Sequence, residues 1–165
     1  MTYRLVALDL DGTLLDSQLQ IRTETIDALA RLRAQGIQAM IVTGRHHVAA
    51  YPYWQQLGLD LPAICCNGAY IYDFANDRPL ASDPLTCDEA RRLLALSRQH
   101  AIYTMVYDRN SMAYETIDGQ LRRMLNWAAT LAPAVRPRFE KVESFEQLVD
   151  SAPAAASTGT GHAAP

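Results

Sequence analysis

Two acidic residues near the start of the chain are the first candidates for chemistry. Asp9 and Asp11 lie in the stretch DLDGTLLD at 9–16, directly after the apolar run Leu5–Leu8. The apolar run predicts a buried strand, and carboxylates at its end are costly to desolvate unless they are paired or bind a metal. The alternative is that the two carboxylates only cap a turn.

The elements that must position these carboxylates alternate between strands and helices. Thr23 is a candidate helix cap, Gly36 a stop signal, and Pro52 is expected to strain or split the second helix. Apolar runs predict strands over 4–9, 37–42 and 61–66, and periodic spacing predicts helices over 24–35 and 46–57. This order predicts an α/β fold with a parallel sheet and right-handed crossovers.

Polar residues follow each of the three expected strands. Asp9 and Asp11 follow the first, Thr43-Gly44-Arg45 the second and Asn67-Gly68 the third. Ligands of open parallel sheets bind beyond the carboxyl ends of the strands. The residue types suit a hard cation together with an anion such as phosphate. Two structural alternatives stay open, a helix cap at Thr43 and a simple turn at Asn67-Gly68.

The second half of the chain predicts a different, α+β unit. A capping box, Thr86 to Glu89, begins a helix that runs to Gln99. Further elements are expected as a hairpin of 69–73 with the region near Leu80, strands over 102–107, 112–115 and 139–142, and helices over 119–130 and 144–149. We predict a first domain at 1–81, a second at 82–150 and a disordered low-complexity tail at 151–165.

Composition excludes several functional classes. The chain has 165 residues and a net charge of −3, which argues against a nucleic-acid partner. It has no apolar run of the roughly 20 residues that cross a membrane and no signal-peptide layout. Three cysteines, Cys65, Cys66 and Cys87, lack metal-ligand spacing, and their odd number suits a reducing cytoplasm. A cytoplasmic protein without membrane or nucleic-acid partners is expected.

The motifs carry a resemblance to a known family. The segment D-x-D-G-T-L at 9–14, followed by T-G-R at 43–45, resembles the haloacid dehalogenase superfamily of phosphohydrolases. The unit inserted after the third strand resembles its Cof-type branch. The stretches TGRHH at 43–47 and ICCNGAYIYD at 64–73 are similar to bacterial pyridoxal phosphate phosphatases. The resemblance implies a Rossmann-like core with an inserted α+β cap.

The resemblance also implies roles for the acidic pair. Asp9 would be the nucleophile that becomes an aspartyl phosphate, and Asp11 the general acid and base. Magnesium would be bound by the Asp9 carboxylate and the Asp11 carbonyl oxygen. The Thr43 side chain and the N–H groups of Leu10 and Gly44 would hold the phosphoryl oxygens.

Three further residues are candidate substrate contacts. They are Arg45, His46 and Asn67, which lie at the ends of the second and third strands. His46 and its neighbour His47 would meet an aldehyde-bearing ring, or else be packed or solvated side chains. The implied function is magnesium-dependent hydrolysis of a small phosphate ester, such as pyridoxal phosphate or a sugar phosphate.

The sequence departs from the family pattern in its second half. The family pattern has a late lysine and a late Gly-Asp acidic pair, whereas here the only lysine is Lys141. We therefore expect a truncated or frame-shifted chain with an incomplete core and an exposed edge at strand 4–9. Two alternative functions follow, a weakly active or inactive fragment that self-associates, and a phosphomutase or phosphotransferase.

Overall fold

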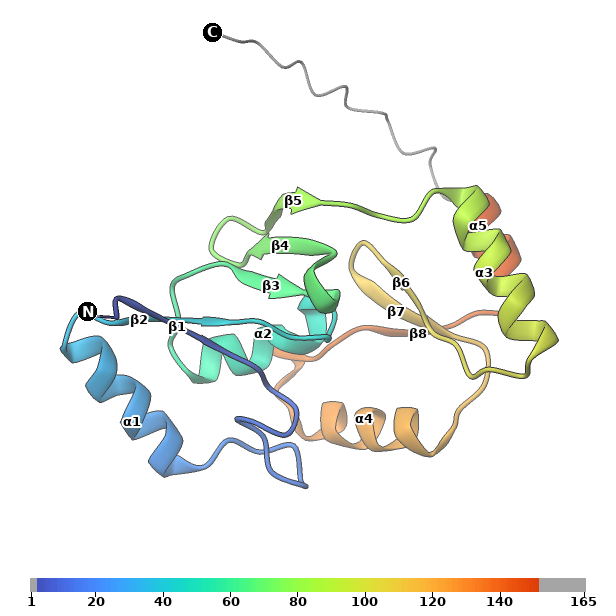
Figure 1. The fold of residues 1–165 in the computed structure, drawn as a ribbon. Coiled ribbons are helices and arrows are strands. Elements are labelled where there is room, and N and C mark those ends of the chain that lie inside the picture. The colour runs from blue at the N-terminus through green and yellow to red at the C-terminus, as the bar shows by residue number, and fades with distance from the viewer. Residues whose placement is uncertain (1–2, 152–165) are drawn as a thin grey trace, which may run out of the picture.

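The computed structural model describes residues 3–151 and begins with a sheet flanked by helices (Figure 1). Strands β1 (Leu5–Leu8) and β2 (Gln38–Ile41) are parallel, and Leu8 lies opposite Ile41. A parallel bridge between Val42 and Ile64 joins β2 to the next strand. That strand forms an antiparallel trio of β3 (Ala63–Cys65), β4 (Tyr70–Asp73) and β5 (Arg78–Ser82). The predicted hairpin near Leu80 is confirmed.

Helices α1 (Thr23–Ala34) and α2 (His47–Gln56) pack their apolar side chains against one face of this sheet. Arg22, and not Thr23, is the N-cap residue of α1, and its side chain makes no capping bond. Pro52 does not split α2. Proline removes only one backbone donor, and burial of Ala50 and Tyr53 in the core holds the helix around it.

The expectation that the apolar run Leu5–Leu8 forms a buried strand is wrong. Its residues alternate between exposed and half-buried, and the Leu5 side chain is 46% exposed. Among the described residues β1 pairs with β2 alone, so its other edge carries unpaired backbone groups. Successive side chains of a strand point to opposite faces, and only the face of β1 that carries Leu8 packs against the core. The expected exposed edge is present.

The second half of the structure is built on a smaller sheet. Its strands β6 (Val106–Asp108), β7 (Ser111–Tyr114) and β8 (Phe139–Lys141) are ordered β6-β7-β8, and β7 and β8 run parallel. Helices α3 (Cys87–Gln99) and α5 (Phe145–Ser151) lie side by side at one end of it (Figure 1). Residues 102–105, predicted as strand, are not strand, because the β6 pairing with β7 begins only at Val106.

Two other predictions for this half, the capping box of α3 and the bounds of the helix over 119–130, are confirmed. The capping box at the start of α3 is present, because Thr86 and Glu89 exchange side-chain to backbone hydrogen bonds. Helix α4 (Gly119–Thr130) has the predicted bounds, and Asp118 caps it by accepting from the Leu121 N–H at 2.7 Å. A short 3-10 helix, η2 (Pro133–Val135), leads from α4 to β8.

The two halves share one core. Trp127 and Ala128 of α4 belong to the same buried cluster as Leu10 and Ile41 of the first sheet. A second, smaller cluster contains Leu94 and Phe145 and lies within the second half. The division at residue 81 stays a prediction. The predicted disordered tail, apart from Ser151, lies outside the described residues.

No helix among residues 3–151 combines the length and the apolar character that a membrane crossing needs.

Candidate active site

Loops that follow three strands of the first sheet meet at one edge. The Val42 N–H donates to the Leu8 carbonyl at 2.9 Å, and the Thr43 N–H donates to the Ile64 carbonyl at 2.9 Å. The Asn67 N–H in turn donates to the Thr43 carbonyl at 3.1 Å. These backbone bonds place Thr43-Gly44-Arg45 between the Asp9 loop and η1 (Cys66–Gly68), as the parallel pattern predicts.

Asp9 begins a tight turn. The Leu10 carbonyl accepts hydrogen bonds from the N–H groups of Thr13, Leu14 and Leu15, and Gly12 supplies the positive φ of 75° that the turn needs. Leu10 itself is fully buried and anchors the turn in the core. The Asp9 side chain is exposed and accepts from the Leu10 N–H at 2.7 Å. The donor expected to bind phosphate therefore bonds the Asp9 carboxylate here.

Asp11 is held by an ion pair that the sequence did not indicate. Arg45 Nε and Nη2 each donate to one oxygen of the Asp11 carboxylate, both at 2.7 Å. This bidentate geometry fixes the plane of the carboxylate. Arg45 is 9% exposed, whereas the Asp11 side chain is 53% exposed. Asp11 therefore keeps a solvent-facing side while its orientation is set by the buried guanidinium.

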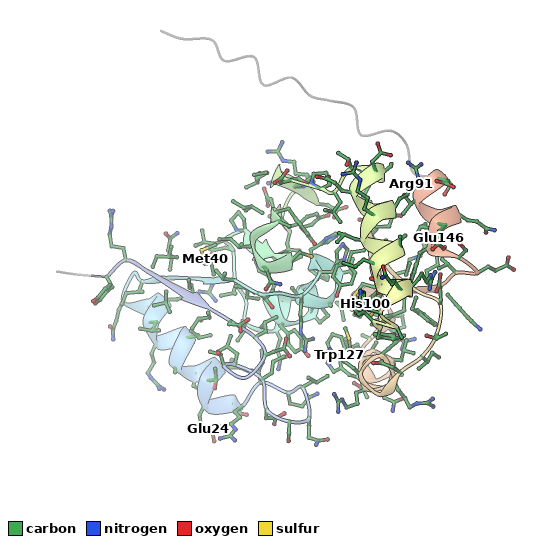
Figure 2. All side chains as sticks on the ribbon, turned by 45° about the vertical axis from the view of Figure 1, so that its right-hand side comes forward. Glu24, Met40, Arg91, His100, Trp127 and Glu146 are labelled. Carbon is green, nitrogen blue, oxygen red and sulfur yellow. The ribbon has the colours of Figure 1, made fainter. Side chains whose placement is uncertain are left out.

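Aromatic rings cover Arg45. Its guanidinium carbon lies 5.2 Å from the ring centre of Tyr53 and 5.5 Å from that of Trp127. Burial by itself would lower the pKa of Arg45, but the contact with Asp11 raises it above its usual value. Figure 2 shows Trp127 directed from α4 toward the N-terminal half. Sequence reasoning missed Tyr53 and Trp127, whose only signal is helical spacing of apolar residues.

The Thr43–Gly44 corner packs against Asn67. Thr43 is buried, and its Oγ1 accepts from the Arg45 N–H at 3.2 Å, so it caps this turn and not helix α2. A Cβ on Gly44 would lie 2.8 Å from Asn67 Oδ1, so a side chain at position 44 would require the Asn67 amide to move. Asn67 adopts a positive φ of 56°. It is thus both a turn residue and a side chain at the site.

His46 and His47 are packed, not solvated. Both are buried, and their ring centres are 4.3 Å apart. His47 Nδ1 lies 2.9 Å from the Tyr70 hydroxyl, and its ring stacks on Tyr72 at 3.8 Å. Burial, reinforced by the neighbouring His47, lowers the pKa of His46 to about 3. Burial likewise lowers the pKa of His47 to about 4, so both rings are neutral at pH 7.

These lowered pKa values predict an acid-sensitive fold. The unfolded chain binds a proton on each imidazole near pH 6.5, whereas the folded chain binds it only near pH 3 for His46 and pH 4 for His47. The contribution of the two neutral imidazoles to the free energy of unfolding is therefore complete above pH 6.5, and it is lost as the pH falls toward pH 4. Urea unfolding at about pH 7.5 and about pH 5, where few carboxylates titrate, measures the loss.

The matched variants for this test are His46→Phe and His100→Gln. His46→Phe is expected to flatten the pH dependence, because it removes one buried imidazole. His100 is exposed at the end of α3 (Figure 2), so His100→Gln is expected to leave the pH dependence unchanged. Equal stability of the unsubstituted chain at the two pH values would contradict the prediction.

The oxygen donors at this edge would supply only a few of the ligands that Mg²⁺ needs. Mg²⁺ is usually held by one or two carboxylates, with water and substrate phosphate completing its shell. Asp9 makes no ion pair among residues 3–151, while the Asp11 carboxylate is engaged by Arg45. Within the same residues no three His, Cys, Asp or Glu side chains gather closely enough to hold a metal. The site present here fits a loosely bound ion.

Comparison with known proteins shows the family. The model of the haloacid dehalogenase-like hydrolase family matches residues 6–152. The chain belongs to this family. It is 46% identical over 147 residues to the pyridoxal phosphate phosphatase YbhA of Escherichia coli K12, a match that covers 89% of this chain and 54% of the relative. The matched family is one of hydrolases.

Solved structures confirm the haloacid dehalogenase-like fold. A haloacid dehalogenase-like hydrolase from Bacteroides thetaiotaomicron aligns with a TM-score of 0.70 at 20% identity, over 88% of this chain and 54% of its own. One from B. subtilis aligns with a TM-score of 0.70 at 24% identity, over 88% of this chain and 56% of its own. The chain spans about half the length of the relatives it matches.

Proposed function

We propose that this chain acts on a small phosphate ester, with Asp9 as the nucleophile that attacks phosphorus. The observation that supports it is the difference between the two carboxylates. Asp9 is exposed and carries no ion pair among the described residues, whereas Arg45 orients Asp11 beside it. A carboxylate without an ion pair suits covalent attack, and the neighbouring Asp11 can transfer protons when one of its oxygens leaves Arg45.

The proposed reaction has two displacements. An Asp9 oxygen bonds to phosphorus while the bond between phosphorus and the ester oxygen breaks, and the ester oxygen takes a proton from Asp11, which enters this step as a neutral carboxyl group with its O–H turned away from Arg45. A water molecule, deprotonated by Asp11, then attacks the phosphoryl group and releases phosphate from Asp9. Thr43 and the Gly44 N–H hold the phosphoryl oxygens, which carry charge in both transition states. Magnesium, held by the Asp9 carboxylate and the Asp11 carbonyl, would neutralise charge between nucleophile and phosphate.

Pyridoxal phosphate is the first substrate to test. The 46% identity to a protein named as a pyridoxal phosphate phosphatase supports this choice. Phosphate release from pyridoxal phosphate by the purified chain is measured with magnesium and with a chelator. Release that requires magnesium is the expected result. The absence of release at any magnesium concentration would overturn the proposal for this chain.

One observation favours a second candidate, a weakly active chain that self-associates. The free edge of β1 and the 46% exposed Leu5 side chain are suited to pairing with another copy. Size-exclusion chromatography with light scattering is expected to show oligomers. Leu5→Lys should shift the chain toward monomer, because a charge on an edge strand blocks pairing. Leu96→Lys is the control, since Leu96 is 49% exposed but lies on α3. A monomer at all concentrations would exclude this candidate.

A further inference from the structure

Two aromatic rings from opposite halves of the chain contact the same buried arginine. Tyr53 belongs to α2 in the first half, and Trp127 belongs to α4 in the second. The guanidinium carbon of Arg45 lies over both rings, 5.2 Å from the Tyr53 ring centre and 5.5 Å from that of Trp127. These distances are within the range of cation–π attraction, which is strongest where water is excluded. Arg45 therefore has aromatic partners in addition to its carboxylate partner, Asp11.

The two rings form a stacked pair in the core. Their centres are 5.2 Å apart, and their planes are inclined by only 11°. Both side chains are buried. The Tyr53 hydroxyl donates to the Leu19 carbonyl at 3.0 Å, which holds that ring in place. Burial raises the pKa of Tyr53 to about 12, so the ring that faces Arg45 stays neutral at pH 7.

Hydrogen bonds account for only part of what holds Arg45. Its Nε and Nη2 donate to the carboxylate of Asp11, which is exposed. Its third guanidinium nitrogen, Nη1, is buried and has no hydrogen-bond partner among residues 3–151. An ion pair with a solvent-exposed carboxylate is weak by itself. The stacked rings therefore supply a restraint on the guanidinium that the ion pair alone does not.

That restraint affects proton transfer by Asp11. In the reaction proposed above, one Asp11 oxygen must leave Arg45 to carry the proton, while the other oxygen stays bound. If the guanidinium moved as well, the carboxyl group would turn freely. General acid–base catalysis depends on the placement of the group, and a misplacement of about 1 Å can lower a rate about a hundredfold. A guanidinium held by the two rings keeps the remaining bond and the direction of the carboxyl group.

Neither ring lines the large cavity between the two halves. This cavity has a volume of about 880 Å³ and lies between the first sheet and the second half, with Tyr70 and Tyr107 among its lining residues. Arg45, Tyr53 and Trp127 are not among them. An effect of the two rings on the reaction would therefore pass through Arg45 and not through contact with a substrate in the cavity.

We propose that Tyr53 and Trp127 are positioning residues, whose stacked rings hold Arg45 so that Asp11 keeps its direction while it transfers protons. The proposal rests on the phosphatase function proposed above, and it adds two residues that act on the reaction through Arg45. It also assigns the second half of the chain a part in the acid–base steps, because Trp127 comes from α4.

Fluorinated tryptophan at position 127 tests the proposal with little change in the shape of the core. Fluorine withdraws electron density from the ring face and weakens cation–π attraction, while the ring keeps nearly its full size. Tetrafluorotryptophan is introduced at position 127 of the full chain by nonsense suppression. The kcat for magnesium-dependent phosphate release from pyridoxal phosphate is expected to fall about fivefold, with KM unchanged. Monofluorotryptophan is expected to give a smaller loss.

The same replacement at position 54 is the matched control. Trp54 lies on α2 next to Tyr53, but its ring packs on the rings of Tyr51 and Phe74. Its fluorination is expected to leave kcat unchanged, and circular dichroism checks that each chain is folded. An equal loss of kcat at both positions would overturn the proposal. A rise in KM without a loss of kcat at position 127 would overturn it too, because the ring would then act on substrate binding.

Exchange of the Arg45 Nε–H with water gives a readout that does not need turnover. NMR spectroscopy of the labelled chain follows this proton, which is assigned by its absence in Arg45→Lys. Exchange is expected to be faster with tetrafluorotryptophan at position 127 and unchanged with it at position 54, because a less restrained guanidinium opens to solvent more often. Unchanged exchange in a chain that releases phosphate would reject the positioning role alone. The absence of phosphate release by the unsubstituted chain would reject the phosphatase function, whatever the exchange rate.

Discussion

Asp9→Asn is expected to abolish phosphate release from pyridoxal phosphate, by a factor on the order of 10⁴ or more. The amide oxygen of asparagine is a poor nucleophile and cannot form the acyl phosphate. It still accepts the hydrogen bond from the Leu10 N–H that Asp9 accepts at 2.7 Å, so the turn is expected to keep its shape. The measurement is the initial rate of phosphate release at saturating magnesium.

A covalent readout makes this prediction independent of turnover. Intact mass spectrometry after acid quench is expected to show one added phosphoryl group on the unsubstituted chain and none on Asp9→Asn. Asp27→Asn is the control, because Asp27 is an exposed carboxylate on α1 and is not one of the residues proposed for the site. An Asp9→Asn variant that retains a substantial part of the activity would show that another residue attacks phosphorus.

The largest expected effect on stability comes from Trp127→Ala. Trp127 is 5% exposed, and its ring stacks on Tyr53 with centres 5.2 Å apart. Truncation removes this stack, leaves a cavity where α4 meets the first sheet and uncovers one side of Arg45. Loss of a buried tryptophan costs about 3–5 kcal/mol. The midpoint of urea unfolding is expected to fall by roughly 1–3 M.

Trp127→Phe is the control for that variant. It keeps an aromatic ring against Tyr53 and Arg45 and loses no hydrogen bond, because Trp127 Nε1 has no partner among the described residues. Its destabilisation is expected to be less than half that of Trp127→Ala. Far-ultraviolet circular dichroism follows unfolding in both variants, since the substitution itself changes fluorescence. Equal stability of Trp127→Ala and the unsubstituted chain would show that α4 does not share the core of the first sheet.

Local patterns were sufficient for much of the fold. The bounds of α4 were predicted correctly, because they depend on apolar periodicity and a nearby cap, which act over a few residues. The capping box of α3 was found for the same reason. The pattern failed at residues 102–105, since an extended apolar stretch becomes strand only where a partner strand faces it.

Burial was the weakest inference from sequence. The apolar run Leu5–Leu8 is typical of a strand covered on both faces, but β1 has one neighbouring strand among the described residues and is half-exposed. Accessibility depends on what surrounds a strand, and its own residues do not specify that. The argument that Asp9 is desolvated at the end of a buried strand also fails, because the Asp9 side chain is exposed.

The sequence by itself determined the order of elements, the family and which residues gather at the strand ends. These follow from short-range periodicity and from motifs whose residues are adjacent in the chain. Only the tertiary structure decided that Arg45 forms an ion pair with Asp11 and that Trp127 covers Arg45. It also decided that aromatic rings from both halves line one cavity. Each of these contacts joins residues far apart in the chain, so packing of whole elements sets them and no local pattern encodes them.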